Sequence, residues 1–248
     1  MLFSIVCSLS LPAFSQGVAI YKKDGSMVKY AYEEIDSIVT YNYGEEPGTP
    51  SLPDTPVASQ YEAVDLGLSV KWATHNVGAT KPEEYGGYYA WGETEEKENY
   101  SWGTYIWCNG SYNTMTKYCT SNSYGTVDNK TVLDPEDDVA HVKWGGDWRM
   151  PTKAEQDELR NNCTWTWTTQ NGVNGYKVTG PNGNSIFLPA AGYRCGTDVY
   201  SRGANGYYWS SSLNSYSFTA CYLDFSDSDY DWSSFDRYYG LSVRPVLK

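Results

Sequence analysis

The chain has 248 residues, which is enough for one sizeable domain and a small second module. Its formal net charge is −12 and no stretch clusters Lys or Arg, which argues against binding the phosphate backbone of nucleic acids or an anionic membrane surface. The 24 Tyr and 10 Trp supply much of the hydrophobic content, and such a composition favours short strands and aromatic loops over helices.

Residues 1–15, MLFSIVCSLSLPAFS, form an apolar stretch that is too short to span a bilayer. The stretch ends in Ala13-Phe14-Ser15, the small-x-small form that a signal peptidase accepts, so we expect an export signal that is cut before Gln16. No Lys or Arg precedes the apolar run, and we expect the charged first part of the signal to be missing. A buried N-terminal strand is the alternative. Export predicts a mature chain in the periplasm, at the cell surface or secreted, with no membrane-spanning segment.

Residues 16–43 are expected to form a small β module. Asp24-Gly25 lies between two runs rich in Val, Ile and Tyr, which is the strongest short-range sign of a β-hairpin. A further strand is expected at 37–41. The module therefore precedes the main domain as a separate β-hairpin unit.

A proline-rich linker is expected at 44–60. Its prolines recur every three residues, the repeat of a polyproline II helix, at Pro47, Pro50, Pro53 and Pro56. Such a segment acts as a semi-rigid spacer, and a disordered linker would give the same boundary. The main domain therefore spans 61–248.

The main domain shows the pattern of short strands with one or two helices. Alternating apolar residues from Val64 to Trp72 predict one strand lying on a core. Thr152 and Glu155 form a capping box that starts a helix, which we expect to end near Asn162. A shorter helix is expected from Pro135, with Val139 and Val142 on it. Further strands are expected at 165–169, 176–178, 186–188, 207–211, 220–225 and 241–246. This content predicts an α+β fold.

Export leaves five cysteines in the mature chain, Cys108, Cys119, Cys163, Cys195 and Cys221. In an oxidising compartment they allow one or two disulfides, and at least one thiol stays free or pairs between chains. No CxxC motif occurs and the only histidines are His75 and His141, which supports neither a zinc site nor a nucleophile held by histidine. The acidic run from Asp134 to Asp138 is better explained as a solvated helix start than as a cation site. We therefore expect no catalytic residue, no metal and no cofactor.

Several motifs occur in a fixed order along the main domain: VDLGLSVKWAT, YYAWGE, WGGDWRMPTKAE, LPAAGYR, YYWSSS and GLSVRPV. Together they resemble the Fibrobacter succinogenes major paralogous domain, which is common in exported proteins of gut Bacteroidetes. The resemblance covers roughly Glu62 to Lys248. It implies a C-type lectin-like fold, related to that of formylglycine-generating enzymes.

The resemblance also suggests two activities that the residues do not support. Formylglycine-generating enzymes use a paired cysteine site, for which only Cys195 and Cys221 are candidates, and the flanking YRCGTD and TACYLD do not match the enzymes' motifs. Calcium-dependent sugar binding needs Glu-Pro-Asn and Trp-Asn-Asp motifs, which are missing; Trp232 is followed by two serines. We therefore expect a non-enzymatic protein, with a degenerate enzyme of the formylglycine-generating type as an alternative.

The C-terminal tail is unusually rich in Ser, Asp, Tyr and Phe. Some relatives on this fold are variable proteins of diversity-generating retroelements, in which reverse transcription replaces bases at template adenines. An Asn codon, AAC or AAT, can then encode Ser, Asp, Tyr, Thr, Phe, Cys, Ala or Leu among others, but never Lys, Glu, Gln, Met or Trp. Residues 214–221, 226–231, 233–236 and 238–239 all belong to that reachable set. The fixed scaffold would be Trp209, Trp232, Arg237, Gly240 and residues 242–245. A fixed polar, aromatic surface on one paralogue is the competing explanation.

Either origin predicts a binding face, because Tyr provides a stiff, amphipathic contact surface and Ser and Asp provide adaptable hydrogen bonds. Trp72, Trp91, Trp144 and Trp148 are expected in or near the core. We expect an unknown protein or glycan ligand, and a structural or adhesive cell-surface subunit is the alternative function. The expected ligand-binding residues are Tyr216, Phe218, Tyr222, Asp227, Asp229, Tyr230, Asp231, Phe235, Asp236, Tyr238 and Tyr239.

Overall fold

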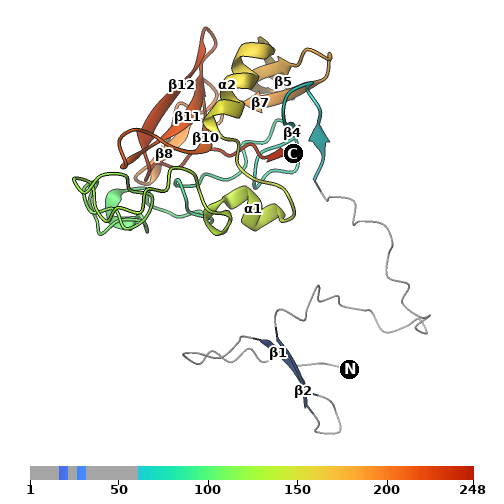
Figure 1. Ribbon diagram of the computed structural model, residues 1–248. Helices are drawn as coiled ribbons and strands as arrows, with labels where there is room; N and C mark the ends of the chain where they lie inside the picture. The colour runs from blue at the N-terminus through green and yellow to red at the C-terminus, as the bar shows by residue number, and fades with distance from the viewer. Residues whose placement is uncertain (1–16, 22–26, 32–60) are drawn as a thin grey trace. The chain divides into compact units, whose positions relative to one another are not determined.

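The computed structural model describes residues 17–21, 27–31 and 61–248 (Figure 1). Contacts divide the chain into two units, Met1–Thr55 and Pro56–Lys248. In the first unit, strands β1 (Gly17–Tyr21) and β2 (Met27–Ala31) pair antiparallel. This pair is the hairpin that the runs around Asp24-Gly25 predicted. The predicted export signal, the strand at 37–41 and the proline-rich linker lie outside the described residues.

The second unit is an α+β arrangement of short, mostly antiparallel strands in several small sheets, with few helices, as predicted. Its helical elements are η2 (Trp102–Thr104), η3 (Pro135–Asp137), α1 (Val139–Trp144) and α2 (Lys153–Asn162). Its strands are β3 (Ala63–Val64), β4 (Lys71–Ala73), β5 (Thr164–Gln170), β6 (Val173–Thr179), β7 (Ser185–Pro189), β8 (Tyr193–Cys195), β9 (Asp198–Tyr200), β10 (Gly206–Leu213), β11 (Thr219–Phe225), β12 (Tyr230–Asp236) and β13 (Val246–Leu247). No helix among the described residues is long and apolar enough to cross a membrane.

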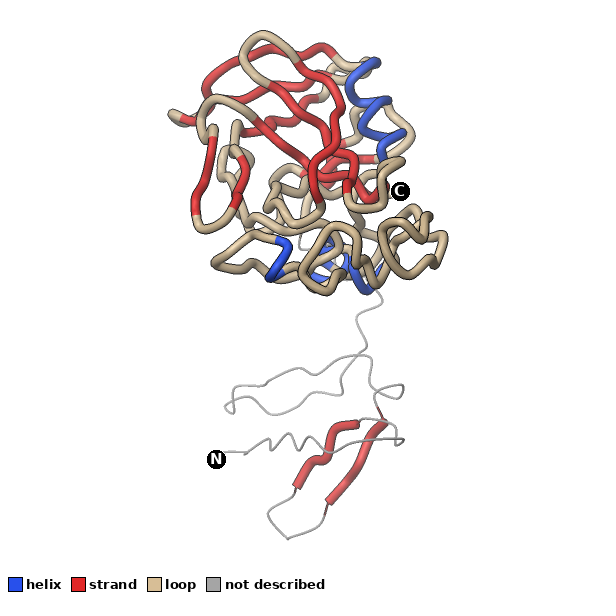
Figure 2. The backbone as a smooth tube through the Cα atoms, turned by 90° about the vertical axis from the view of Figure 1, so that its left-hand side faces the viewer, coloured by secondary structure: helices blue, strands red, loops and turns tan. Residues whose placement is uncertain are grey.

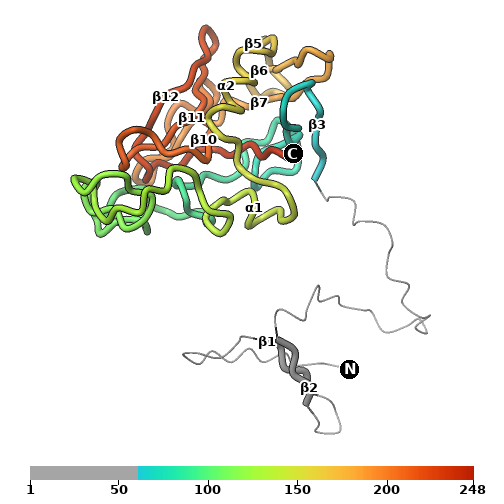
Figure 3. The backbone as a smooth tube through the Cα atoms, in the orientation of Figure 1, coloured from blue at the N-terminus to red at the C-terminus, as the bar shows by residue number. Residues whose placement is uncertain are grey.

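Strands and loops of the second unit occupy different regions. The sheets β10–β11–β12 and β5–β6–β7 gather beside α2, and the strands fill one half of the unit in Figure 2. The segment before α1, green in Figure 3, folds mainly as loops that lie together on the other side. Residues 108–134 lie in this segment and form no helix and no ladder of paired strands, only isolated bridges.

Two buried tryptophans join these regions. The Trp91 indole N–H donates to the carbonyl of Ser210 at 2.8 Å, and the Trp209 indole N–H donates to the carbonyl of Tyr89 at 2.9 Å. Neither ring is exposed to solvent, and each has its N–H satisfied, as a buried indole requires. Trp72, Trp144 and Trp148 also lie in or against the core, as predicted.

Helix α2 begins at the predicted capping box and ends at Asn162, as predicted. The Thr152 hydroxyl accepts from the Glu155 N–H, and the Glu155 carboxylate accepts from the Thr152 N–H at 2.7 Å. The helix covers the central sheet through buried Leu159 and Gln156, whose amide donates to the carbonyl of Tyr208 at 2.9 Å. The capping box thus starts α2, and the contacts of Gln156 and Leu159 hold the helix against β10.

The prediction of one shorter helix from Pro135 was wrong. Asp138 adopts an extended conformation between η3 and α1, because its carboxylate caps the second helix by accepting from Ala140 and His141 N–H groups. Val139 is buried, whereas Val142 is exposed. The capping aspartate therefore splits the segment into two short helical pieces.

The prediction of a continuous strand from Val64 to Trp72 was also wrong. The segment is a hairpin in which β3 and β4 pair antiparallel, with Ala63 opposite Ala73. The chain reverses around Gly67, which has a φ of +77°, a conformation that residues with a Cβ rarely adopt. Leu66 is nevertheless fully buried. The alternating pattern therefore predicted correctly which residues are buried, but it wrongly predicted one continuous strand.

The C-terminal segment crosses the core instead of forming the single strand predicted at 241–246. Leu241 bridges to Tyr89, Ser242 bridges to Tyr208, and only β13 at the end forms a ladder, with β4. Each successive residue finds a different partner because the segment runs between loops and sheets. The β13–β4 pairing brings the two ends of the second unit together.

Candidate functional site

The predicted variable tail forms two strands of one antiparallel sheet. Strand β12 is the edge of the sheet β10–β11–β12 and pairs with β11 from Phe225↔Tyr230 to Thr219↔Asp236. Alternate residues of β12 face opposite sides of the sheet, so the predicted site residues separate into groups.

One group lies on a surface of contacting rings, which we call the aromatic platform: Tyr193, Tyr200, Tyr207, Phe235, Tyr238 and Tyr239. The Phe235 ring centroid is 4.9 Å from that of Tyr239, 5.4 Å from Tyr193 and 5.7 Å from Tyr207. All six side chains are half-buried or exposed, with Tyr200 the most open at 45%. The platform is therefore accessible to a ligand.

Sequence reasoning missed three platform members, Tyr193, Tyr200 and Tyr207, because they precede the tail. Tyr193 and Tyr200 face each other across the β8–β9 hairpin, which was not predicted. Tyr207 lies opposite Asp224 on β11. A signal existed for Tyr207, since the alternation through Trp209 places both on the same face of β10.

Tyr222 does not belong to the accessible face. It is only 2% exposed, and its ring lies beneath Phe235 at a centroid distance of 4.6 Å. Burial raises the pKa of its hydroxyl well above the usual value. Tyr222 is therefore a core residue that supports the platform from below, which corrects the prediction.

Two half-buried carboxyls flank the platform. Burial raises the pKa of Asp236 above its ordinary value. Burial also raises the pKa of Asp224, and the nearby carboxylates of Asp229 and Asp231 raise it further. Both carboxyls beside the rings are therefore harder to ionise than a free aspartate.

Asp224→Asn is expected to raise the melting temperature at neutral pH and to lose that advantage in acid. A raised folded-state pKa means that the ionised carboxyl costs stability above that pKa. The cost vanishes as the pH falls below the ordinary value of 3.8, where the folded and unfolded states are both protonated. Thermal melts at about pH 7 and about pH 3 check this. The exposed Asp227→Asn is the control, and an equal shift at both pH values would contradict the expectation.

A second group lies at the β11–β12 turn. Asp227 and Asp229 are exposed there, and Asp231 forms an ion pair with Arg160 of α2. The Tyr230 ring stacks on Trp165 at 4.7 Å with an interplanar angle of 12°. This group therefore borders α2 and β5, not the platform.

A third group lies in the loop before β11. Tyr216 is 56% exposed and Phe218 is half-buried. Their rings contact Tyr124 and, for Phe218, Tyr112, which come from the loop region before α1. The structure thus brings Tyr216 and Phe218 together with residues that the sequence did not single out.

Trp232 and Arg237 are two of the scaffold residues predicted within the tail, and they differ in their environment. Arg237 is fully buried, as expected of scaffold. Trp232 is 40% exposed, with the ammonium of Lys153 4.0 Å from its ring centroid, so the prediction that it locks the scaffold was wrong. Its place on β12 directs it towards α2.

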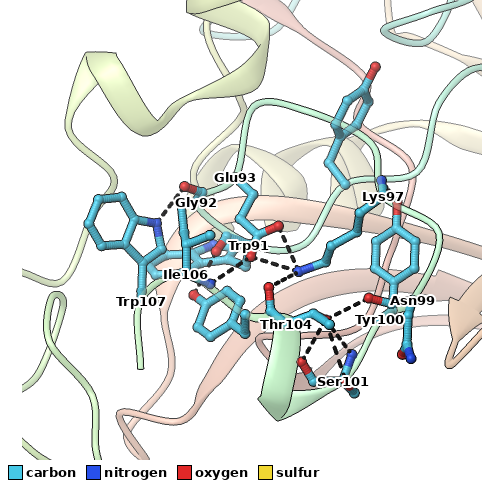
Figure 4. Close-up of polar contacts among 12 residues, drawn as sticks. Trp91, Gly92, Glu93, Lys97, Asn99, Tyr100, Ser101, Thr104, Ile106 and Trp107 are labelled. Carbon is cyan, nitrogen blue, oxygen red and sulfur yellow. Dashed lines mark hydrogen bonds and ion pairs between the residues drawn. The ribbon is translucent and has the colours of Figure 1, made fainter. Parts of the chain in front are cut away.

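A buried carboxylate outside the tail is fully partnered. Glu93 forms an ion pair with Lys97 at 2.7 Å and accepts from the Ile106 N–H at 3.0 Å (Figure 4). Lys97 also donates to the carbonyl of Thr104, which closes the loop around η2. With these partners Glu93 holds the loop in place and is not available as a free base.

The cysteines and the acidic run form no shared centre among residues 61–248. All five cysteines there are free thiols. Lys117 forms ion pairs with Asp134 at 2.8 Å and Asp137 at 2.5 Å, while Asp138 caps α1. No group of three or more His, Cys, Asp or Glu side chains among the described residues is placed to hold a metal ion.

Residues 149–246 match the family model of a domain of unknown function, DUF8237. The matched segment begins just before α2 and includes β5 to β12, so it contains the whole platform sheet. No curated protein and no solved structure matches the chain.

Proposed function

We propose that this chain is an exported, non-catalytic ligand-binding protein and that the aromatic platform is its binding face. The observation that supports the proposal most directly is one accessible surface of contacting rings. Phe235 contacts Tyr193 and Tyr207, Tyr239 contacts Tyr193, and Tyr238 stacks on Tyr239. Rigid rings bind at a low cost in side-chain entropy, and hydroxyls at their edges add directional hydrogen bonds. The flanking Asp224 and Asp236 favour a neutral or cationic ligand surface over an anionic one.

We further propose a C-type lectin-like fold of the Fibrobacter succinogenes major paralogous domain kind for residues 61–248. Three features support it: the paired ends of the unit through β13 and β4, the capped helix α2 against the sheet, and the long, mainly loop region between β4 and α2. The ordered sequence motifs are the other support.

We also propose that the tail is diversified by a retroelement, and burial limits which of its positions can vary. Arg237, Gly240 and Ser242 are buried, and a Cβ at Gly240 would lie 2.5 Å from the Tyr100 ring, so these positions cannot vary freely. Ala220 and Cys221 are also buried, although they fall in the reachable set. We therefore restrict the proposed variation to accessible positions of the tail.

A near-copy of codons 207–246 is expected downstream of the gene, beside a reverse transcriptase gene, if diversification operates. The copy should carry adenines at the accessible Ser, Asp, Tyr and Phe positions and match the gene at Arg237 and Gly240. Sequencing the flanking DNA checks this. Absence of the copy would make the tail a fixed surface and leave the binding proposal to the next test.

The binding proposal predicts that Tyr200→Ser, Tyr239→Ser and Asp236→Asn, combined in one variant, weaken ligand binding at least about tenfold. The labelled full chain is applied to an oligosaccharide array and to an array of purified extracellular proteins, and the affinity of each hit is measured for the wild type and the variant. The altered side chains are half-buried or exposed, so the variant should remain folded in a thermal melt.

Ile106→Ala is the matched control, because Ile106 is an exposed apolar residue outside the platform. It should bind as the wild type does. Unfolding of the triple variant would mean that these side chains are structural. Equal binding by the variant and the wild type, or no hit on either array, would contradict the proposal.

A further inference from the structure

We propose that a second surface, the loop cluster of Tyr112, Tyr124, Tyr216 and Phe218, binds neutral carbohydrate without a metal ion. The inference depends on the proposed function in one respect, since Tyr216 and Phe218 belong to the predicted binding face. The four rings contact one another, and among residues 61–248 no ring contact joins them to the platform. The two surfaces can therefore be tested separately.

The loop cluster combines two exposed rings, Tyr112 and Tyr216, with two half-buried rings, Tyr124 and Phe218. Tyr112 and Tyr124 meet the Phe218 ring at 70° and 63°, with centroids 5.4 Å and 5.1 Å away, and Tyr216 is tilted 31° to it. Tyr112 is 49% exposed and Tyr216 is 56% exposed, which is a large exposure for aromatic residues. Rings at several orientations offer stacking faces to the apolar C–H faces of a sugar ring.

The two loops that carry the rings are tied together beneath the surface. The buried Arg237 guanidinium donates to the carbonyl of Ser217 at 2.9 Å and to that of Tyr118 at 3.2 Å. The Thr120 N–H donates to the Ser217 hydroxyl at 3.0 Å. The Met115 N–H donates to the carbonyl of Tyr124 at 2.7 Å, which closes the other loop on itself. Because the loops are already held in place, a ligand pays little conformational entropy to order them, which favours binding.

The absence of free charge around the rings selects the class of ligand. In 109–127 and 213–219 the only charged side chain is Lys117, and its ammonium is held by Asp134 and Asp137. The exposed residues next to the rings in sequence are Asn113, Ser123 and Ser215. Amides and hydroxyls around aromatic faces match the alternating hydroxyls and C–H faces of neutral sugars. A charged partner would find no complementary charge here.

Native affinity electrophoresis of the full chain tests the proposal, since a net charge of −12 carries the protein towards the anode. The gels contain laminarin, xylan, galactomannan or starch as neutral probes, and polygalacturonate as an acidic one. At least one neutral polysaccharide should retard the wild type. Tyr112→Ser with Tyr216→Ser should weaken that retardation at least about tenfold, which corresponds to about 1.4 kcal/mol. Tyr112→Phe with Tyr216→Phe should keep most of it, because the ring faces remain.

Ile106→Ala is the matched control, because Ile106 is exposed and belongs to neither surface, and it should be retarded like the wild type. The platform variant with Tyr200→Ser and Tyr239→Ser distinguishes the two proposals. Its loss of retardation together with unchanged binding by the loop variant would overturn the inference and keep the platform proposal. No retardation by any neutral probe, or retardation by polygalacturonate alone, would also overturn it. So would self-association of the wild type that the Ser variant abolishes, because the surface would then bind a second copy of the chain. Thermal melts of each variant confirm folding.

Discussion

Arg237→Met is expected to lower the free energy of unfolding by about 3 to 5 kcal/mol. The guanidinium is fully buried and donates to the Tyr105 hydroxyl at 2.7 Å and to carbonyls of Lys117, Tyr118 and Ser217. Methionine fills a similar volume but leaves these acceptors without a donor in the core. Urea unfolding followed by tryptophan fluorescence measures the change.

The loss should be specific to the buried site. Arg202→Met is the matched control, because Arg202 is exposed and its guanidinium donates to a single group, the Tyr88 hydroxyl, so that its substitution should cost only about 1 kcal/mol. Arg237→Lys should recover only part of the loss, since an ammonium cannot reproduce the planar fork of donors. A variant Arg237→Met as stable as the wild type would show that the loops of the loop cluster are held by other contacts.

Arg244→Met is expected to destabilise the second unit by about 3 kcal/mol or more. Its guanidinium donates to the Asn76 side-chain oxygen at 2.8 Å, to the carbonyls of Ala73 and Thr74 at 3.1 Å, and to that of Phe187 at 2.9 Å. Burial lowers the pKa of Arg244 to about 10, so the site bears a desolvation cost that these bonds offset. The measurement is the same urea titration, with Arg202→Met again as the control.

Arg244 lies in the C-terminal segment and binds Ala73 and Thr74, in and next to β4, so it joins the two ends of the second unit. It also contacts β7 through the carbonyl of Phe187. Hydrogen exchange should therefore accelerate first in β4 and β13 of the Arg244→Met variant. Faster exchange confined to the loop region before α1 would contradict this assignment, because that region is the part that Arg237 holds.

The two buried arginines show where sequence reasoning succeeded and where it stopped. Arg237 was expected to be scaffold because it interrupts a run of Ser, Asp and Tyr, and the structure agrees. Nothing local identifies its distant partners, since Tyr118 and Lys117 lie 119 and 120 positions earlier in the chain. Trp232 interrupts the same run in the same manner and is exposed. Interrupting a run of Ser, Asp and Tyr therefore does not predict burial for a residue such as Trp232, which lies on the edge strand β12.

The site residues show the same limit. Composition identified the tail as an aromatic, polar surface, and Phe235, Tyr238 and Tyr239 do lie on the platform. Composition could not separate Tyr222, which is buried, from Tyr216, which is open, because both are tyrosines in the same run. The register of β11 against β12 decides which side chains face solvent, and register depends on the whole sheet.

The sequence by itself determined the features that depend on neighbouring residues. The Thr152–Glu155 capping box started α2, the runs around Asp24-Gly25 formed a hairpin, and few helices with many short strands made an α+β unit. Tertiary structure alone decided the split of the strand at Gly67, the path of the C-terminal segment through the core and the division of the predicted site into separate surfaces. Those outcomes depend on contacts between residues far apart in the chain, which local pattern and composition do not encode.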